Sequence, residues 1–118
     1  MSYLTKYALP DTVPRSRGGA RVDLDVLLNR PDFDGGASVR AYVQDTSRLP
    51  TRLRRLPKPQ LILQISDCIN EINLEFSVSS YERRENSLHK IETLLDALAQ
   101  FRAGLAAEAE LRARRERR

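Results

Sequence analysis

Three kinds of side chain in this sequence could carry out chemistry: one histidine, one cysteine and a row of carboxylates. No Ser–His–Asp or Cys–His set can be argued for His89, so we expect it to be a surface or half-buried residue. Cys68 lies between Ile65 and Ile69, where a buried, unreactive thiol is expected. The carboxylates of Asp67, Glu71 and Glu75 recur every four residues without histidine partners, which favours a solvated face over a metal site. We therefore expect no catalysis, no metal and no cofactor.

Arginine is the residue type whose distribution stands out. The stretch RLPTRLRRLPKP at positions 48–59 combines five positive charges with three prolines, and the chain ends in LRARRERR. Arginine presents a planar fork of donors to phosphate oxygens and stacks on bases, which suits nucleic acid, RNA in particular. The nucleic-acid-binding residues predicted from this distribution are Arg48, Arg52, Arg54, Arg55, Lys58, Arg112, Arg114 and Arg115.

Charge is segmented along the chain, although the net charge of the 118 residues is only +4. Residues 1–60 hold eleven Lys and Arg against six Asp (+5), residues 61–110 hold four against nine acidic residues (−5), and residues 111–118 hold five against one (+4). Separated basic segments can attract a polyanion, or they can pair with the acidic segment of the same or another copy. The length suits one domain. With a single cysteine, no export signal and no long apolar run, we expect a cytoplasmic protein that does not enter a membrane.

The first half of the chain shows weak periodicity. Residues 1–21 read as an extended arm, and residues 22–118 as a single helical domain. Residues 22–30 suit either a strand or a short helix, and the helix is favoured because no second strand is evident to pair with it. A second short helix is expected over residues 38–48, with Ser38 as its N-cap. Prolines then predict a stiff basic connector over residues 48–59.

The second half predicts two long helices, over residues 60–78 and 82–116, the latter starting near Ser79. Their apolar side chains, worth about 1.5–3 kcal/mol each when buried, cannot offset the entropy of ordering some fifty residues at about 1.5 kcal/mol apiece. The expected fold is therefore all-α, an antiparallel helical hairpin with short N-terminal helices that forms a helical bundle by self-association. The predicted oligomer core is Ile65, Ile69, Ile72, Phe76, Leu88, Ile91, Leu95 and Leu98.

From Leu49 onward, the order of features resembles a family of small four-helix bundles. The features are LPTRLRR, the apolar segment LILQISDCINEI, the turn YERR, and a helix with the spacing L-x-x-I-x-x-L-L-x-x-L-x-x-F-R. The family includes the accessory variability determinant of diversity-generating retroelements and the proteins encoded by ribosomal RNA intervening sequences. The resemblance implies a basic oligomeric bundle that binds nucleic acid and assists a partner enzyme. It also implies that Arg83 and Arg84 bind nucleic acid together with Arg52, Arg54 and Arg55. This sequence departs from the family because it lacks a long first helix and a separate fourth helix.

Two functions remain open from these observations. One is a non-catalytic oligomeric accessory protein that binds RNA or DNA through arginine–phosphate contacts. The other is an interaction scaffold or adaptor that docks a larger protein partner through a helix face, without nucleic acid. Self-association is expected in either case.

Overall fold

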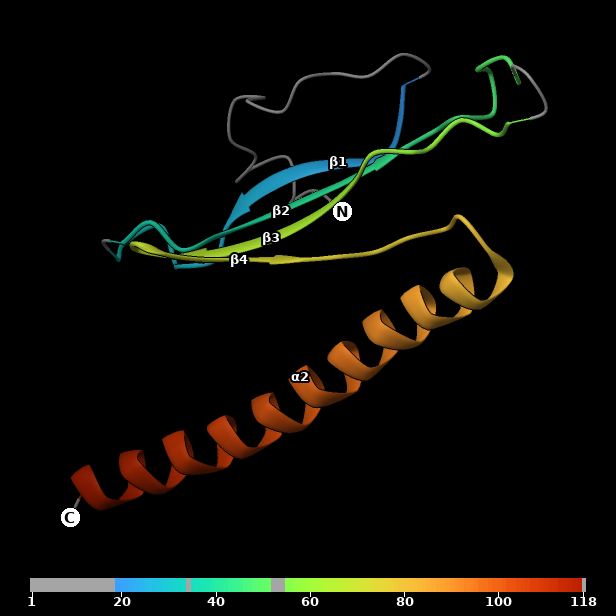
Figure 1. Ribbon diagram of the computed structural model, residues 1–118. Coiled ribbons are helices and arrows are strands. Elements are labelled where there is room, and N and C mark those ends of the chain that lie inside the picture. The colour runs from blue at the N-terminus through green and yellow to red at the C-terminus, as the bar shows by residue number, and fades with distance from the viewer. Residues whose placement is uncertain (1–18, 34, 52–54, 118) are drawn as a thin grey trace. The chain divides into compact units, whose positions relative to one another are not determined.

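The computed structural model describes residues 19–33, 35–51 and 55–117. These residues form four strands and one helix (Figure 1). The all-α prediction is therefore wrong, because the described residues form an α+β protein with an antiparallel sheet and no helical bundle. The elements are β1 (Ala20–Leu27), β2 (Ser38–Gln44), β3 (Leu61–Asp67), β4 (Asn70–Leu74) and α2 (Tyr81–Glu116).

The four strands form an antiparallel meander in the order β1-β2-β3-β4. The loop between β1 and β2 is closed by the Leu28 amide, which donates to the Ala37 carbonyl at 2.9 Å. The longer β2–β3 connection is closed at its base by two bonds. The Gln44 amide donates to the Gln60 carbonyl at 2.9 Å, and the Gln60 amide donates to Gln44 Oε1 at 2.8 Å. Side chain and backbone of one glutamine thus hold both ends of that connection together.

The predicted helix over residues 60–78 is instead the β3–β4 hairpin. Its two-residue turn is Cys68-Ile69, and Cys68 adopts a left-handed backbone with φ of 56°. Short turns between antiparallel strands require such positive φ values because they match the twist of the strands. Cys68 and Ile69 are both exposed there, Ile69 to 96%, so the expected buried thiol is also wrong.

The two short helices predicted over residues 22–30 and 38–48 are the strands β1 and β2. β1 pairs with β2, and β2 pairs in turn with β3, so its backbone groups find partners on both sides. For residues 22–30, the sequence favoured a helix over a strand only because no partner strand was evident. The partner is β2, in the neighbouring segment for which a helix was also predicted. Pairing between segments outweighs the local ambiguity of period.

The register sorts the sheet's side chains onto two contrasting faces. One face, here called the apolar face, carries rows such as Leu24–Ala41–Leu63–Leu74 and Val26–Val39–Ile65–Ile72. The opposite, polar face carries Asp25, Arg40, Gln64 and Asn73 in one row. Successive residues of a strand point to opposite faces, which is why the alternation along each strand separates these rows. The polar face also carries Tyr42, which is 2% exposed and pairs with Ile62.

α2 begins at a clear cap. Ser80 has an extended backbone, and its Oγ accepts a hydrogen bond from the Arg83 amide at 3.1 Å. Glu82 lies in the first turn and Arg114 and Arg115 in the last, which complements the helix dipole. The cap is Ser80 and not the predicted Ser79. With 36 residues the helix is about 54 Å long.

The chain divides into two compact units between Ser79 and Ser80, the sheet unit and the helix unit. Few of the described residues are buried: Ala37, Tyr42 and Gln44 in the sheet unit, and none in α2. Within the described ranges, no helix combines the length and the apolar character needed to cross a membrane.

Candidate functional site

The apolar face of the sheet is a continuous surface that spans all four strands of the sheet unit. It comprises Val22, Leu24, Val26, Val39, Ala41, Val43, Leu61, Leu63, Ile65, Ile72 and Leu74. None of these side chains is buried, and Ile72 on the edge strand is 59% exposed. A sheet face composed of aliphatic side chains normally packs against a second layer. The apolar face is therefore a candidate binding surface.

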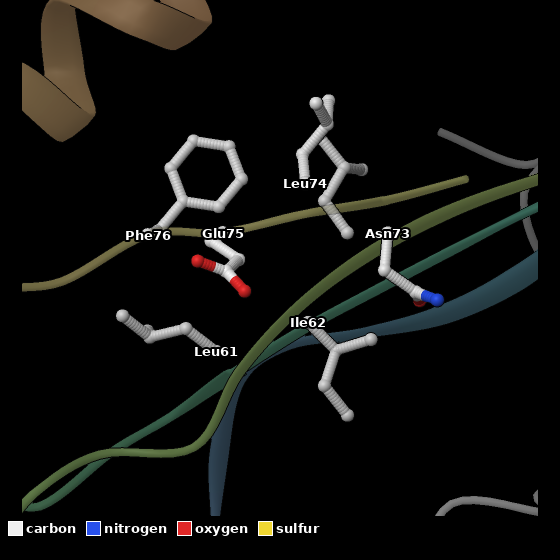
Figure 2. A pocket seen from close by; sticks show the side chains of 7 residues that line it. Leu61, Ile62, Asn73, Leu74, Glu75 and Phe76 are labelled. Atoms are coloured by element: carbon white, nitrogen blue, oxygen red, sulfur yellow. The ribbon is translucent and has the colours of Figure 1, made fainter.

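A shallow depression opens at the β4 side of the sheet, with a volume of about 320 Å³ (Figure 2). The β3–β4 ladder ends at the pair Leu63 and Leu74, and beyond this pair the two segments of the chain are no longer hydrogen-bonded as strands. The depression is lined by Leu61, Ile62, Leu63, Asn73, Leu74, Glu75 and Phe76. Its lining is mostly aliphatic and aromatic with one carboxylate, so it extends the apolar surface and provides no set of catalytic groups.

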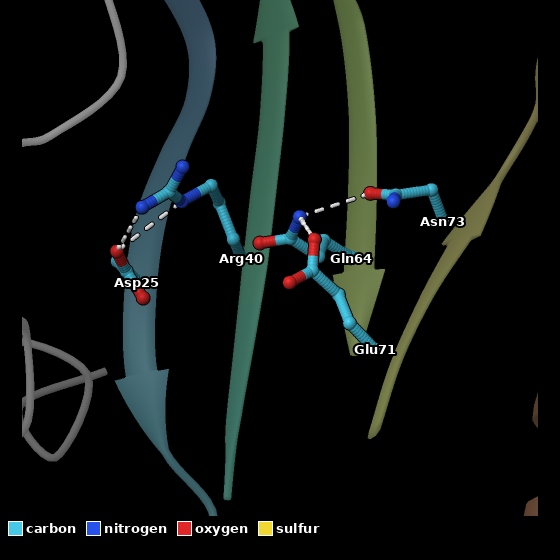
Figure 3. A network of polar contacts seen from close by, with 5 residues as sticks. All are labelled: Asp25, Arg40, Gln64, Glu71 and Asn73. Atoms are coloured by element: carbon cyan, nitrogen blue, oxygen red, sulfur yellow. Dashed lines mark hydrogen bonds and ion pairs between the residues drawn. The ribbon is translucent and has the colours of Figure 1, made fainter. Parts of the chain in front are cut away.

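The polar face carries a network of side chains across all four strands (Figure 3). Arg40 Nε and Nη2 lie 3.3 and 3.2 Å from Asp25 Oδ2, and both side chains are largely buried, with 27% and 13% exposed. On the other half of the sheet, Gln64 Nε2 donates to Asn73 Oδ1 at 3.0 Å and also to Glu71 Oε1. These residues are cross-strand neighbours, so the network fixes the register of the sheet and leaves no poised acid or base.

Among the described residues, the carboxyl group of Asp45 has a perturbed pKa. The pKa of Asp45 lies below its usual value chiefly because the Ser47 amide donates to its Oδ1 at 2.9 Å, a bond that favours the ionised form. The Arg21 guanidinium, 3.1 Å from the same oxygen, acts in the same direction. This arrangement caps the bend after β2, and it is structural. The described residues contain no cluster of His, Cys, Asp or Glu that could hold a metal ion.

The second candidate surface is a stripe of large apolar side chains along α2, here called the apolar stripe. It consists of Leu88, Ile91, Leu94, Leu95, Leu98, Phe101 and Leu105. Successive members are three or four residues apart or adjacent, so they cover one side of the helix over about five turns. Most are more than half exposed; Leu98, near the middle, is 53% exposed and Phe101 is 69% exposed. A stripe of this width is typical of a helix that packs against another surface.

The predicted basic site divides between the two units. Arg52 and Arg54 lie outside the described residues, while Arg48, Arg55 and Lys58 are exposed in the sheet unit. The other five lie in α2, in its first turn or near its end: Arg83, Arg84, Arg112, Arg114 and Arg115. The two groups therefore belong to different units.

The basic end of α2 is partly neutralised within the helix. Arg112 Nε lies 3.6 Å from Glu116 Oε1, and Arg117 Nη2 lies 3.7 Å from Glu110 Oε1. Both pairs are largely exposed, so they hold their partners weakly. Arg114 and Arg115 have no ion-pair partner among the described residues.

The predicted oligomer core also separates. Leu88, Ile91, Leu95 and Leu98 lie on the apolar stripe as expected from their spacing. Ile65 and Ile72 instead lie on the apolar face of the sheet, and Phe76 follows β4. Ile69 is at the tip of the hairpin and contributes to neither surface. Ile65, Ile69, Ile72 and Phe76 therefore do not form one helical stripe.

Two smaller predictions concerned polar residues. The row of Asp67, Glu71 and Glu75 is not a face of a helix, because the first two lie on opposite faces of the hairpin and Glu75 lies beyond β4. His89 is exposed on α2, and its Nε2 lies 3.4 Å from Thr93 Oγ1 one turn later. The strand residues of the apolar face were missed by sequence reasoning, although the alternation in LILQIS and INLEF could have revealed them.

Comparison with known proteins does not extend these observations. No protein-family model, no curated protein and no solved structure matches this chain.

Proposed function

We propose that this protein is a non-catalytic interaction protein that self-associates, burying the apolar face of its sheet and the apolar stripe of α2 against a second copy. The observation that carries this proposal is that both surfaces are continuous and apolar and that none of their side chains is fully buried. Exposed apolar patches of this extent mark interaction surfaces.

The size of the two surfaces supports a second copy as the occupant. Strands of seven residues and four-strand width give the apolar face a projected area of about 23 by 19 Å, or about 440 Å². The apolar stripe, about 26 Å long and 10 Å wide, adds about 260 Å². Neither surface alone reaches the roughly 800 Å² per partner of a standard stable interface, but together they come close to it. A partner that covers both at once satisfies this requirement, and a dimer does so symmetrically.

The experiment is sedimentation equilibrium of the full chain, with one charged substitution on the stripe and a matched one on the far side of α2. We expect the wild type to sediment as a species of twice 13.5 kDa at micromolar concentration. Leu98→Glu should raise the dissociation constant at least tenfold because it places two carboxylates in the interface of a dimer. Thr93→Glu, on the opposite side of the helix, should leave it within about twofold.

The sheet surface is tested in the same way. Ile72→Glu should weaken association, whereas Ser66→Glu, on the polar face of β3, should not. A wild-type chain that remains a monomer at tens of micromolar, with its sheet and helix signals intact by circular dichroism, contradicts the proposal. That outcome leaves two binding partners to test, a larger protein for the apolar surfaces and a polyanion for the basic segments.

A further inference from the structure

The apolar stripe contains two lines of residues repeating every seven positions. One line runs through Leu88, Leu95 and Arg102, and the other through Ile91, Leu98 and Leu105. Two adjacent lines with a seven-residue repeat are the pattern by which two helices pack side by side. A single basic residue, Arg102, interrupts the first line, and its place in the pattern determines which orientation of a partner helix is tolerated.

We propose that α2 pairs in antiparallel orientation with α2 of a second copy, with Leu95 lying opposite Leu98 of the partner subunit. This inference rests on the proposed self-association and names its geometry. In this register each line of one helix faces the other line of its partner. Leu88 then lies opposite the partner's Leu105, and Arg102 opposite the partner's Ile91. All six contacts of the central segment follow from the one alignment.

Charge favours this orientation over the parallel one. In a parallel pair, Arg102 would lie against Arg102 of the partner subunit, and Arg112 against the partner's Arg112, so like charges would meet inside or beside the apolar seam. In the antiparallel pair, Arg102 lies beside the partner's Glu92 at the margin of the seam. The long aliphatic part of the arginine side chain can remain over the seam while its guanidinium reaches the carboxylate.

The ends of the helix agree with the same register. α2 has Glu82 and Glu85 in its first turns and Arg112, Arg114 and Arg115 in its last turns. Antiparallel pairing places Arg112 next to the partner's Glu82, and it places Arg83, which shares the first turn with Glu82, opposite the partner's Glu110. It also opposes the two helix dipoles. The Arg112–Glu116 pair within the helix is 80% and 70% exposed, so it can be exchanged for a contact between subunits.

Cysteine cross-linking tests the orientation. In a Cys68→Ser background, the variants Leu88→Cys and Leu105→Cys are prepared separately, refolded together and treated with a short bis-maleimide. Antiparallel pairing predicts that the mixed Leu88→Cys with Leu105→Cys product dominates, because two copies of position 88 lie about 26 Å apart. A parallel pair predicts the opposite, with each variant linking to itself. The matched control is Thr93→Cys mixed with Gln100→Cys, which has the same alignment on the far side of the helix and should give little product.

A charge exchange tests the register. Glu92→Arg and Arg102→Glu should each raise the dimer dissociation constant about fivefold, and the double variant should return it to within about twofold of wild type. The two residues are about 15 Å apart along one helix, so recovery requires contact between subunits. Circular dichroism confirms that each variant keeps its helix. A dimer that shows neither mixed cross-linking nor recovery overturns the antiparallel pair while self-association stands, whereas a wild-type monomer overturns both.

Discussion

The Arg40–Asp25 pair shows what single residues contribute to this sheet. Arg40 lies at the centre of the polar row, where it contacts Asp25 on β1 while its neighbour on β3, Gln64, contacts Asn73 and Glu71. A charged pair with both partners largely buried is held in place by its surroundings, unlike the exposed pairs on α2. Removal of one partner leaves the other charge without compensation in a partly dry environment. The polar face thus specifies the order of the strands, whereas the apolar face has no such preference.

Arg40→Leu should lower the free energy of unfolding by about 1–3 kcal/mol, because the Asp25 carboxylate would stay largely buried without its counter-charge. Arg30→Leu is the matched control, since the Arg30–Asp32 pair has 75% and 59% of its side chains exposed and should contribute under about 0.5 kcal/mol. Urea denaturation followed by circular dichroism measures both. Equal losses for the two variants would mean that the Arg40 pair does not depend on its burial.

At the scale of elements, the helix could be predicted from the sequence and the sheet could not. The leucines of residues 88–105 fit a helical period and no strand period. In residues 61–76, by contrast, Ile65, Ile69 and Ile72 follow one another at steps of four and three residues, as on a helix. The structure separates them, with Ile65 on β3, Ile69 in the turn and Ile72 on β4. The hairpin turn Cys68-Ile69 contains neither glycine nor proline, so no local signal marks it.

Local signals were also insufficient to assign β1 from the sequence. Its alternation is visible in RVDLDV, but a strand is stable only with a partner, and that information lies in residues 38–44. Of the candidate surfaces, the apolar stripe followed from spacing alone, while the apolar face depends on a register between four segments. Non-local pairing is what a single pass along the sequence fails to provide.

The hairpin turn gives a prediction at this scale. Cys68 has φ of 56°, a conformation that costs a non-glycine residue about 1 kcal/mol, so Cys68→Gly should stabilise the sheet unit by about 0.5–1 kcal/mol. Ile69→Gly is the control, because Ile69 has no positive φ and should gain nothing. Thermal unfolding monitored by the strand signal compares the two. A loss of stability in Cys68→Gly would argue against a left-handed backbone at this position.

At the scale of the whole molecule, the chain has more apolar surface than its own described core uses. The core contains Ala37 and Tyr42, while fourteen large apolar residues remain exposed, six of them on α2. The sequence-based expectation that this chain needs a further covering surface applies to the sheet and the helix, although it was derived for two helices. The segmented charge has a counterpart in α2, whose first turns hold two acidic and two basic residues and whose last turns are basic.

Nucleic-acid binding stays a prediction from the arginine distribution. If it holds, affinity for a labelled single-stranded RNA should fall steeply with salt, with a log–log slope of about −0.7 per phosphate contact. Arg114→Ala/Arg115→Ala should then make that slope shallower by about 1.4, since these two arginines are not neutralised by described carboxylates. Arg30→Ala, whose guanidinium already pairs with Asp32, should leave the slope unchanged. Binding that does not respond to salt, or no binding, excludes arginine–phosphate contacts.

The meander leaves β1 and β4 as the two outer strands of the sheet. Outer strands with free backbone groups can recruit the same strand of another molecule, and repetition of that step produces fibrils. Here β1 carries an irregularity between Ala20 and Val22 together with two aspartates, and β4 is short and bears Glu71. Lateral growth of the sheet would bring these carboxylates into line with their own copies. The molecule can therefore present a wide aliphatic surface for association in one direction while resisting polymerisation in the other.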